Sequence, residues 1–248
     1  MAASQFSIVI AVKNESSNIP PLFAEISDVY LKLRDFGLIT DLVVVDDDST
    51  DGSRQAITLK GQDLLAKGMR VKTVFRTGQS GTVSAQIAGA IASDASYIIV
   101  MDGDFQHDPK FIGQLVSRID GNVDVVVASR YMRGGVLNLN LNRALVSNIA
   151  SLLAHVVIGN SRVCSDPLSG FFICKRDWII QLHPYGGKNK LLLYILAKYK
   201  GLRICEVPFS MGRRASGESK IAQSYAKMMI RYLSELLTYR HVEESILI

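Results

Sequence analysis

Short apolar runs alternate with longer amphipathic stretches along the first 130 residues of the chain. Runs of this kind predict buried strands, and the stretches between them have the spacing of helices with one apolar face. The expected strands are 7–12, 41–45, 70–75, 97–101 and 123–128, and the expected helices are 20–33, 53–67, 82–92 and 109–119. This alternation predicts an α/β fold, a doubly wound and mainly parallel sheet with helices on both faces.

The pattern becomes less regular after residue 130. We expect helices over 143–158, 190–199 and 219–239, and strands over 171–175 and 202–207. The chain contains no internal repeat, low-complexity tract or flexible linker. We therefore expect one domain over residues 1–218, followed by a C-terminal amphipathic helix within 219–248.

The last expected helix has an apolar side and a basic side. Its apolar residues are Ile221, Tyr225, Met228, Met229, Tyr232, Leu233, Leu236 and Leu237, and its basic residues include Lys227 and Arg231. Such a helix either packs its apolar side on the parent domain or lies in the interface of a membrane. The sequence alone leaves both interpretations open.

Composition fits a folded protein of a reducing compartment. Hydrophobic residues make up 48% of the chain, enough for a large core, and the cysteines at 164, 174 and 205 have no metal-binding spacing. The N-terminus shows no export signal, and no apolar run reaches the ~18 residues of a transmembrane helix. We expect a cytoplasmic protein, peripheral on the cytoplasmic face of a membrane or held there by a separate membrane-anchoring subunit.

Charge is distributed unevenly along the chain. Residues 1–174 carry 15 Lys/Arg against 17 Asp/Glu, whereas residues 175–240 carry 13 against 4. A basic segment of this kind favours an anionic partner such as a phosphate, a membrane surface or a nucleic acid. A solvated helical face is the alternative for any single lysine.

The clearest candidate for chemistry is the apolar run 98–101, which ends in Asp102 and Asp104 with Gly103 between them. A strand here places both carboxylates at its carboxyl end, where open α/β sheets bind ligands. Two carboxylates this close repel each other, so a hard divalent cation with oxygen ligands is the simplest partner, and Gln106 adds a neutral oxygen. Gly103 allows a tight turn. A solvated acidic turn remains the alternative for an isolated Asp-x-Asp.

Five segments together resemble a known family. They are residues 43–52 (VVVDDDSTDG), 101–107 (MDGDFQH), 128–131 (ASRY), 166–172 (DPLSGFF) and 217–220 (GESK). Each is weak alone, but their order over residues 6–220 resembles the inverting family 2 glycosyltransferases. The resemblance is stronger to the branch that contains dolichyl-phosphate mannose synthases and polyprenyl-phosphate glycosyltransferases.

This resemblance implies a GT-A fold whose residues 1–130 bind a nucleotide-diphosphate sugar and Mg²⁺ or Mn²⁺. It assigns the metal to Asp102, Asp104 and Gln106, because a diphosphate between carboxylates needs a bridging cation. Helix capping is the alternative role for Gln106. It assigns the nucleotide sugar to Ala11, Asn14, Glu15, Asp47, Gly81 and Asp102. His107 is interpreted as a structural turn residue.

The resemblance assigns the acceptor to residues 131–218. Enzymes that glycosylate a hydroxyl need a carboxylate base, often in a Glu-Asp or Asp-Asp pair, and no such pair occurs between residues 125 and 205. A phosphate acceptor is already an oxyanion and needs cations instead. The resemblance places the acceptor phosphate on Arg130, Arg143, Ser147, Arg214 and Lys220, with Asp104, Arg130 and Arg214 as the catalytic residues. A surface salt bridge is the alternative for each arginine alone.

The predicted function is inverting transfer of a hexose, mannose from GDP-mannose, to a dolichyl or polyprenyl phosphate. The alternatives are another donor (UDP-glucose or UDP-GlcNAc), a hydroxyl acceptor, or a non-catalytic nucleotide-sugar-binding protein. A nucleic-acid partner is not expected. The sequence departs from the branch at one position, because Tyr194 stands where members of the branch often have Glu. If this position contacts the sugar or the acceptor, we expect an unusual donor specificity. A phosphatase-type Asp-x-Asp would lie on an early strand, whereas this motif follows three strand–helix units.

Overall fold

The computed structural model describes residues 5–78, 81–135, 141–158, 164–182 and 190–212. The strands are β1 (Phe6–Val12), β2 (Thr40–Asp47), β3 (Val71–Arg76), β4 (Tyr97–Asp102), β5 (Val125–Ser129), β6 (Phe172–Lys175) and β7 (Ile204–Pro208). The helices are α1 (Ile19–Asp35), α2 (Ser53–Ala66), α3 (Thr82–Ala92), α4 (Ile112–Val116), α5 (Leu141–Ile158), α6 (Arg176–Ile180) and α7 (Leu191–Lys198), with a 3-10 turn η1 (Pro109–Phe111).

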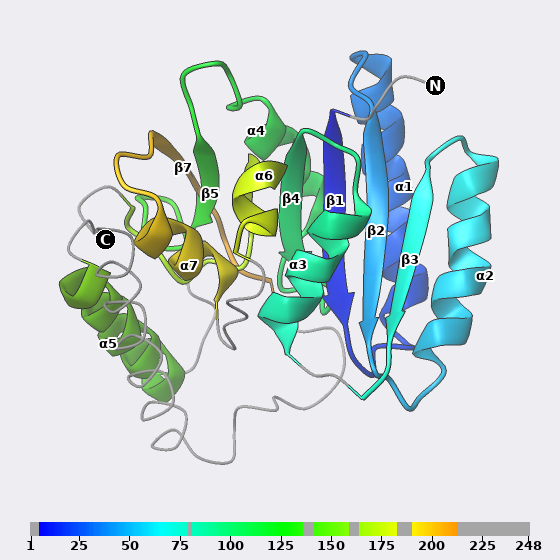
Figure 1. Ribbon diagram of the computed structural model, residues 1–248, viewed down its shortest axis with the longest axis horizontal. Helices are drawn as coiled ribbons and strands as arrows, with labels where there is room; N and C mark the ends of the chain where they lie inside the picture. Colours follow the sequence, from blue (N-terminus) through cyan, green and yellow to red (C-terminus); the bar gives the residue numbers. More distant parts are fainter. Residues whose placement is uncertain (1–4, 79–80, 136–140, 159–163, 183–189, 213–248) are drawn as a thin grey trace.

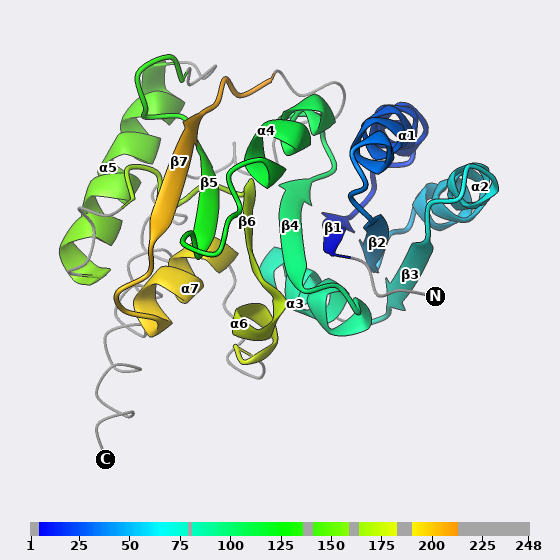
Figure 2. The same ribbon diagram turned by 90° about the horizontal axis from the view of Figure 1, so that it is seen from above.

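The strands form one sheet in the order β3-β2-β1-β4-β6-β5-β7 (Figure 1). All neighbouring pairs are parallel except those of β6, which runs antiparallel to both β4 and β5. Helices α1, α2 and α4 cover one face, and α3, α6 and α7 cover the other (Figure 2). The predicted doubly wound, mainly parallel sheet is confirmed.

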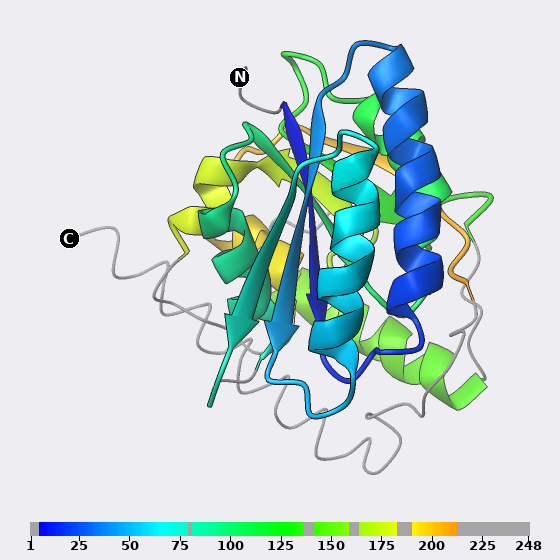
Figure 3. The ribbon, with the colours of Figure 1, turned by 90° about the vertical axis from the view of Figure 1, so that its right-hand side faces the viewer.

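Register explains why the polar residues gather at one edge of the sheet. Val12 pairs with Asp46, Ala11 pairs with Asp102, and Asp47 pairs with Arg76. Because these strands are parallel, their carboxyl ends meet at the same edge. Helix α5 lies toward that end of the molecule in two perpendicular views (Figures 1 and 3).

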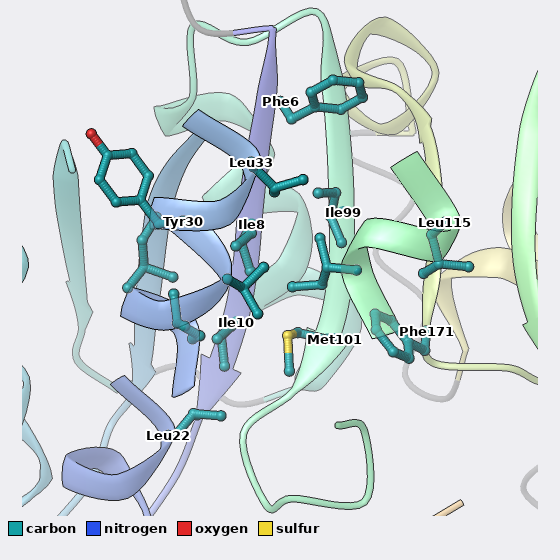
Figure 4. Packing of buried hydrophobic residues seen from close by; sticks show 14 of the residues in the cluster. Phe6, Ile8, Ile10, Leu22, Tyr30, Leu33, Ile99, Met101, Leu115 and Phe171 are labelled. Atoms are coloured by element: carbon teal, nitrogen blue, oxygen red, sulfur yellow. The ribbon is translucent and has the colours of Figure 1, made fainter. Parts of the chain in front are cut away.

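Two apolar layers hold the helices on the sheet. In the first, side chains of α1 and α4 pack on β1 and β4: Leu22 lies beside Ile10, Leu33 lies toward Phe6, and Leu115 lies beside Phe171 (Figure 4). The second joins α3, α6 and α7 to the opposite face of the sheet. Strands buried on both faces are expected to be continuously apolar, which is the pattern seen in the sequence.

The residue that follows β4, Gly103, packs closely against side chains of β1. A Cβ on Gly103 would lie 2.9 Å from Val12 Cγ1 and 3.2 Å from Ile10 Cγ2. The residue after β4 is therefore glycine because the chain passes directly against β1, whereas the sequence suggested only a tight turn. The strained position of this turn is at Phe105, whose φ is +64°.

Several expected elements differ from the observed ones. The helix expected over 109–119 is shorter, because it is divided into η1 and α4, which ends at Val116. Helix α6 follows β6 directly and was not expected. The C-terminal helix predicted over 219–239 lies outside the described residues. Within the described part of the chain, none of the helices has the length and hydropathy needed to cross a membrane.

Candidate active site

The turn after β4 brings the expected metal ligands together. Asp104 is buried, with 6% of its surface exposed, and its Oδ1 accepts a hydrogen bond from the Gln106 backbone N–H at 3.1 Å. The Asp102 side chain is 31% exposed, so it faces the edge of the sheet more openly. Phe105 takes the left-handed conformation between Asp104 and Gln106. The turn thus holds two carboxylates and one amide within five residues.

This donor set fits a hard divalent cation. Carboxylate and amide oxygens are the ligands that Mg²⁺ and Mn²⁺ prefer. Among the described residues there is no group of three or more His, Cys, Asp or Glu that could hold a metal by themselves. Two carboxylates and an amide would leave coordination positions for a bound diphosphate, as expected when a metal is shared with a substrate.

His107 closes the turn. Its Nδ1 accepts a hydrogen bond from the Asp102 backbone N–H at 2.8 Å, so Nδ1 carries no proton. Burial, the largest influence, lowers the pKa of His107 although the Asp102 carboxylate acts in the opposite direction. The 3.7 Å approach of Nδ1 to Asp102 Oδ2 is therefore not an ion pair. The ring stacks on Phe171, with centroids 5.2 Å apart, which fits the expected place of His107 within the turn.

Asp47, an expected nucleotide contact, is held between β3 and α3. Its Oδ1 lies 2.8 Å from Arg76 Nη1, and its Oδ2 accepts a hydrogen bond from the Gly81 N–H at 2.8 Å. Arg76 also donates to Ser84 Oγ at 2.9 Å. Gly81 has a φ of +139°, which favours glycine. The structure therefore joins Asp47 and Gly81, and adds Arg76, which the sequence did not single out.

A second arginine organises the end of β2. Arg54 Nε donates to the fully buried Asp46 Oδ1 at 2.7 Å, and the same guanidinium also bonds the Arg76 carbonyl. Its Cζ lies 5.5 Å from the centroid of the Phe75 ring, which is 44% exposed. Asp46 is therefore a fully buried acid that holds Arg54 in place.

The loops after β1 and β2 are tied to each other. The Asn14 N–H donates to Ser49 Oγ at 2.9 Å, and Asn14 Oδ1 accepts from the Thr50 N–H at 2.8 Å. Glu15 continues this contact through its N–H to Ser53 Oγ at 2.9 Å. Asn14 has a φ of +56°, a conformation that Asn tolerates better than most residues.

Asp51 completes the same loop pair. Burial raises its pKa, but hydrogen bonds from Ser53 and Ser16 act more strongly together and hold the pKa at about 2. Ala11, the remaining nucleotide candidate, is half-buried near the carboxyl end of β1 beside Asp102. The five nucleotide candidates outside β4 therefore lie on the ends of β1 and β2 and on the start of α3.

Arg130 follows β5 and is held by an acid from a distant loop. Its Nε and Nη2 each donate to one oxygen of Asp166 at 2.7 Å, and its N–H donates to Asp166 Oδ2 at 3.1 Å. Burial lowers the pKa of Arg130, but the Asp166 hydrogen bonds and charge outweigh it and leave the pKa raised. The Asp102 carboxylate also raises the pKa of Arg130, so Arg130 lies within electrostatic reach of the turn 102–107, called the metal turn below because it carries the expected metal ligands.

The other expected acceptor residues are only partly described. Ser147 of α5 lies 3.1 Å from the Tyr131 hydroxyl, so α5 touches the segment that carries Arg130. Arg143 belongs to α5 one turn earlier, and only its backbone is described. Arg214 and Lys220 lie outside the described residues.

An edge strand holds the loop that carries Asp166. Glu206 of β7 accepts hydrogen bonds from the Ser165 N–H at 2.9 Å and from Ser165 Oγ at 2.7 Å. The same loop reaches the metal turn, because a Cβ on Gly170 would lie 3.2 Å from Asp102 Oδ2. The loop 164–170 therefore connects the Arg130 side of the edge to the Asp102 side.

The segment after β7 also touches the metal turn. The Gly212 N–H donates to the Gln106 carbonyl at 3.0 Å, and a Cβ at Gly212 would lie only 2.6 Å from the Phe105 carbonyl oxygen. Only glycine fits this approach. Arg214 follows two residues later in the sequence.

The sequence did not predict the residues whose hydrogen bonds and ion pairs fix the predicted site residues in place. Arg76 ends a strand next to Asp47 and could have been found by aligning the strand ends. Asp166 belongs to one of the five family-like segments but had no assigned role. Glu206 gave no signal, because a single acid on an edge strand has no distinctive pattern.

Comparison with known proteins identifies the family. Residues 7–215 match the family model described as Glycosyl transferase family 2. Dolichol-phosphate mannosyltransferase of Pyrococcus furiosus is 35% identical over 236 residues, which cover 94% of this chain and 64% of that protein. The protein of the same name from Saccharomyces cerevisiae is 30% identical, with 94% of this chain and 85% of that protein covered. The chain thus spans less than two thirds of the Pyrococcus relative.

Solved structures share the fold. A mannosyltransferase from Pyrobaculum calidifontis, in complex with GDP-Man and Mn²⁺, aligns with a TM-score of 0.61 at 16% identity, covering 96% of this chain and 64% of that one. Mannosyl-3-phosphoglycerate synthase from Rubrobacter xylanophilus gives 0.64 at 15%, covering 94% and 74%. The expected GT-A fold is confirmed. With most of its length matched to the family model, the chain belongs to glycosyl transferase family 2.

Proposed function

We propose that this chain transfers mannose from GDP-mannose to a dolichyl or polyprenyl monophosphate, with inversion at the anomeric carbon. The relatives named dolichol-phosphate mannosyltransferase support the transferred sugar and the acceptor class, and the structural neighbour in complex with GDP-Man supports the donor. One observation about the site favours a phosphate acceptor over a hydroxyl. The acids beside the end of β5, Asp166 and Glu206, already accept hydrogen bonds from Arg130 and Ser165, so neither carboxylate is available as the base that a hydroxyl acceptor needs.

On the donor side, Asp102, Asp104 and Gln106 would hold Mg²⁺ or Mn²⁺. When bound, the cation neutralises the diphosphate and stabilises it as a leaving group. Asp47 and Gly81 would contact the base, and Ala11, Asn14 and Glu15 would line the nucleotide from the β1 side. Arg76 and the Gly81 N–H keep the Asp47 carboxylate in place.

On the acceptor side, Arg130, Arg143, Ser147, Arg214 and Lys220 would bind the lipid phosphate. Asp166 directs Arg130 through a bidentate contact, the geometry that fixes a guanidinium most firmly. A phosphate monoester is ionised near pH 7, so no side chain has to remove a proton before it attacks.

The transfer itself needs little covalent chemistry from the protein. A phosphate oxygen of the lipid attacks the anomeric carbon and forms the new C1–O bond. The bond from C1 to the β-phosphate oxygen of GDP-mannose breaks, and GDP departs with its electron pair. Asp104, Arg130 and Arg214 would act by positioning these groups and stabilising their charges.

We also propose which parts of the chain bind the donor, the acceptor and the membrane. Residues 1–130 would bind the donor and residues 131–218 the acceptor, at the cytoplasmic face of a membrane. The segment 219–248 would bring the chain to the lipid as an amphipathic interfacial helix, alone or with a membrane-anchoring subunit.

A matrix of donors and acceptors tests the proposal. GDP-mannose, UDP-glucose and UDP-GlcNAc are each incubated with the full chain, Mn²⁺, and either a short polyprenyl phosphate or the matching polyprenyl alcohol. We expect turnover for GDP-mannose with the phosphate. Turnover with the polyprenyl alcohol but not with the phosphate would refute the proposed acceptor. Turnover with a UDP-sugar but not with GDP-mannose would refute the proposed donor. Binding of GDP-mannose without turnover on either lipid would favour a non-catalytic nucleotide-sugar-binding protein.

A further inference from the structure

His107 is a buried titratable side chain beside the metal turn for which the proposed reaction has no use. It is 5% exposed and packs against two phenyl rings that also contact each other, 5.2 Å from the Phe171 centroid and 6.0 Å from the Phe209 centroid. Gly170 presses on the ring from another side, because a Cβ there would lie 3.0 Å from His107 Cε1. The ring therefore has one defined orientation.

That orientation aims Nδ1 at the main chain of the turn. The Asp102 N–H donates to Nδ1 at 2.8 Å, and a backbone amide cannot act as an acceptor in this contact. Nδ1 is consequently a neutral acceptor, and the ring proton is on Nε2. His107 cannot offer Nδ1 to a metal while it holds this hydrogen bond.

The hydrogen bond closes a loop of main chain from Asp102 to His107 that contains every expected metal ligand. Inside the loop, Phe105 has a φ of +64°, a conformation that an isolated chain avoids for a bulky residue. Strained positions of this kind persist where the surroundings over-determine them. Two contacts hold the main chain on either side of Phe105: the hydrogen bond from the Asp102 N–H to His107 Nδ1, and the hydrogen bond from the Gly212 N–H to the Gln106 carbonyl.

From this geometry we propose that His107 is a positioning residue for the metal turn, acting as a neutral acceptor that fixes the Asp102 main chain and thereby the spacing of the Asp102 and Asp104 carboxylates. The proposal rests on the proposed function only in taking these carboxylates as the metal ligands. It predicts that the acceptor atom, and not the aromatic ring, is what metal binding requires.

Two variants separate the acceptor from the ring. His107→Phe keeps an aromatic ring packed against Phe171 and Phe209 but leaves the Asp102 N–H without its acceptor. His107→Asn gives up the ring and keeps an acceptor, Oδ1, at the position of Nδ1. A purely structural histidine would leave both folded variants with the same metal affinity, whatever their stabilities.

The measurement is Mn²⁺ binding to the full chain in the presence of GDP, followed by the loss of the free Mn²⁺ signal in electron paramagnetic resonance. We expect His107→Phe to weaken Mn²⁺ binding by about 10–100-fold, the usual effect of losing a residue that orients a ligand. His107→Asn should retain most of the affinity. Equal affinities in the two variants, or wild-type affinity in His107→Phe, would overturn the proposal.

A second measurement on the wild type keeps the proposal testable if His107→Phe does not fold. Nitrogen-15 spectra of the histidine ring should show the proton on Nε2 and an unprotonated Nδ1 coupled to the Asp102 amide. A proton on Nδ1 would overturn the proposal. Failure of mannosyl transfer with intact Mn²⁺ binding would refute the proposed function alone, whereas a wild type that binds no Mn²⁺ with GDP would refute both.

Discussion

Asp166 should be among the residues whose loss is most costly to stability. The change is Asp166→Ala, which removes the bidentate partner of Arg130 where the two side chains are 0% and 12% exposed. Removing one member of a buried pair leaves an uncompensated charge and costs about 3–5 kcal/mol. For a chain of 248 residues this corresponds to a fall in Tm of about 6–20 °C.

Urea unfolding followed by circular dichroism measures the effect, with Asp177→Ala as the matched control. Asp177 is also an aspartate beside an arginine, but its side chain is 74% exposed and 3.8 Å from Arg176. The control should change the free energy of unfolding by less than about 0.5 kcal/mol. Adding Arg130→Met to Asp166→Ala should recover part of the loss, because it removes the stranded charge. A loss under about 1 kcal/mol for Asp166→Ala, or no recovery, would refute the reasoning.

Three further predictions concern packing, pH and the acceptor side. Gly89→Ala should cost about 1–3 kcal/mol in unfolding free energy, because its Cβ would lie 2.5 Å from a methyl of β1, whereas Gly113→Ala, with open space, should be neutral or stabilising. The low pKa of Asp51, about 2 against an ordinary value of 3.8, means that its stabilisation is complete above pH ~4 and is lost as the pH falls toward 2. The free energy of unfolding of Asp51→Asn, measured by urea unfolding, should therefore depend less on pH between about 4 and 2 than that of the wild type. An unchanged pH dependence would contradict this prediction. Tyr131→Phe, which breaks the 3.1 Å contact with Ser147, should cost about 0.5–1.5 kcal/mol and raise the KM for the lipid phosphate more than that for GDP-mannose.

The fold was predictable from the sequence where the pattern was regular. Strands buried on both faces are continuously apolar, so β1, β2 and β4 were found within about two residues of their ends. The strand–helix alternation by itself then placed Asp47 and Asp102 at one edge of the sheet. Helix 82–92 was predicted with its observed bounds because glycine and serine mark its two ends.

The antiparallel insertion of β6 between β4 and β5 could not be predicted in the same way. Its neighbours in the sheet lie far from it in the sequence, and an apolar strand carries no mark of its direction. Helix α6 is only five residues long, too short for a helical period to appear.

Within the site, the sequence indicated the residues that we propose bind the ligands but not the residues that hold those side chains in place. Asp102 and Arg130 stand in recognisable motifs, whereas Glu206 depends on a hydrogen bond to a residue 41 positions away. The interpretation of Gly103 was incomplete for a similar reason, because contact with Val12 decides that position. Such support comes from tertiary contacts, which a local pattern does not encode.

The most direct test of the account is the structure of the product made from GDP-mannose, a short polyprenyl phosphate and Mn²⁺ by the full chain. Phosphorus and proton NMR of the extracted lipid identify the atom that received the sugar and the configuration at C1. We expect mannose bonded through C1 to the lipid phosphate oxygen in the β configuration, the inverse of the α-linked donor. An α-linked product, or mannose bonded to a carbon-borne hydroxyl, would contradict it.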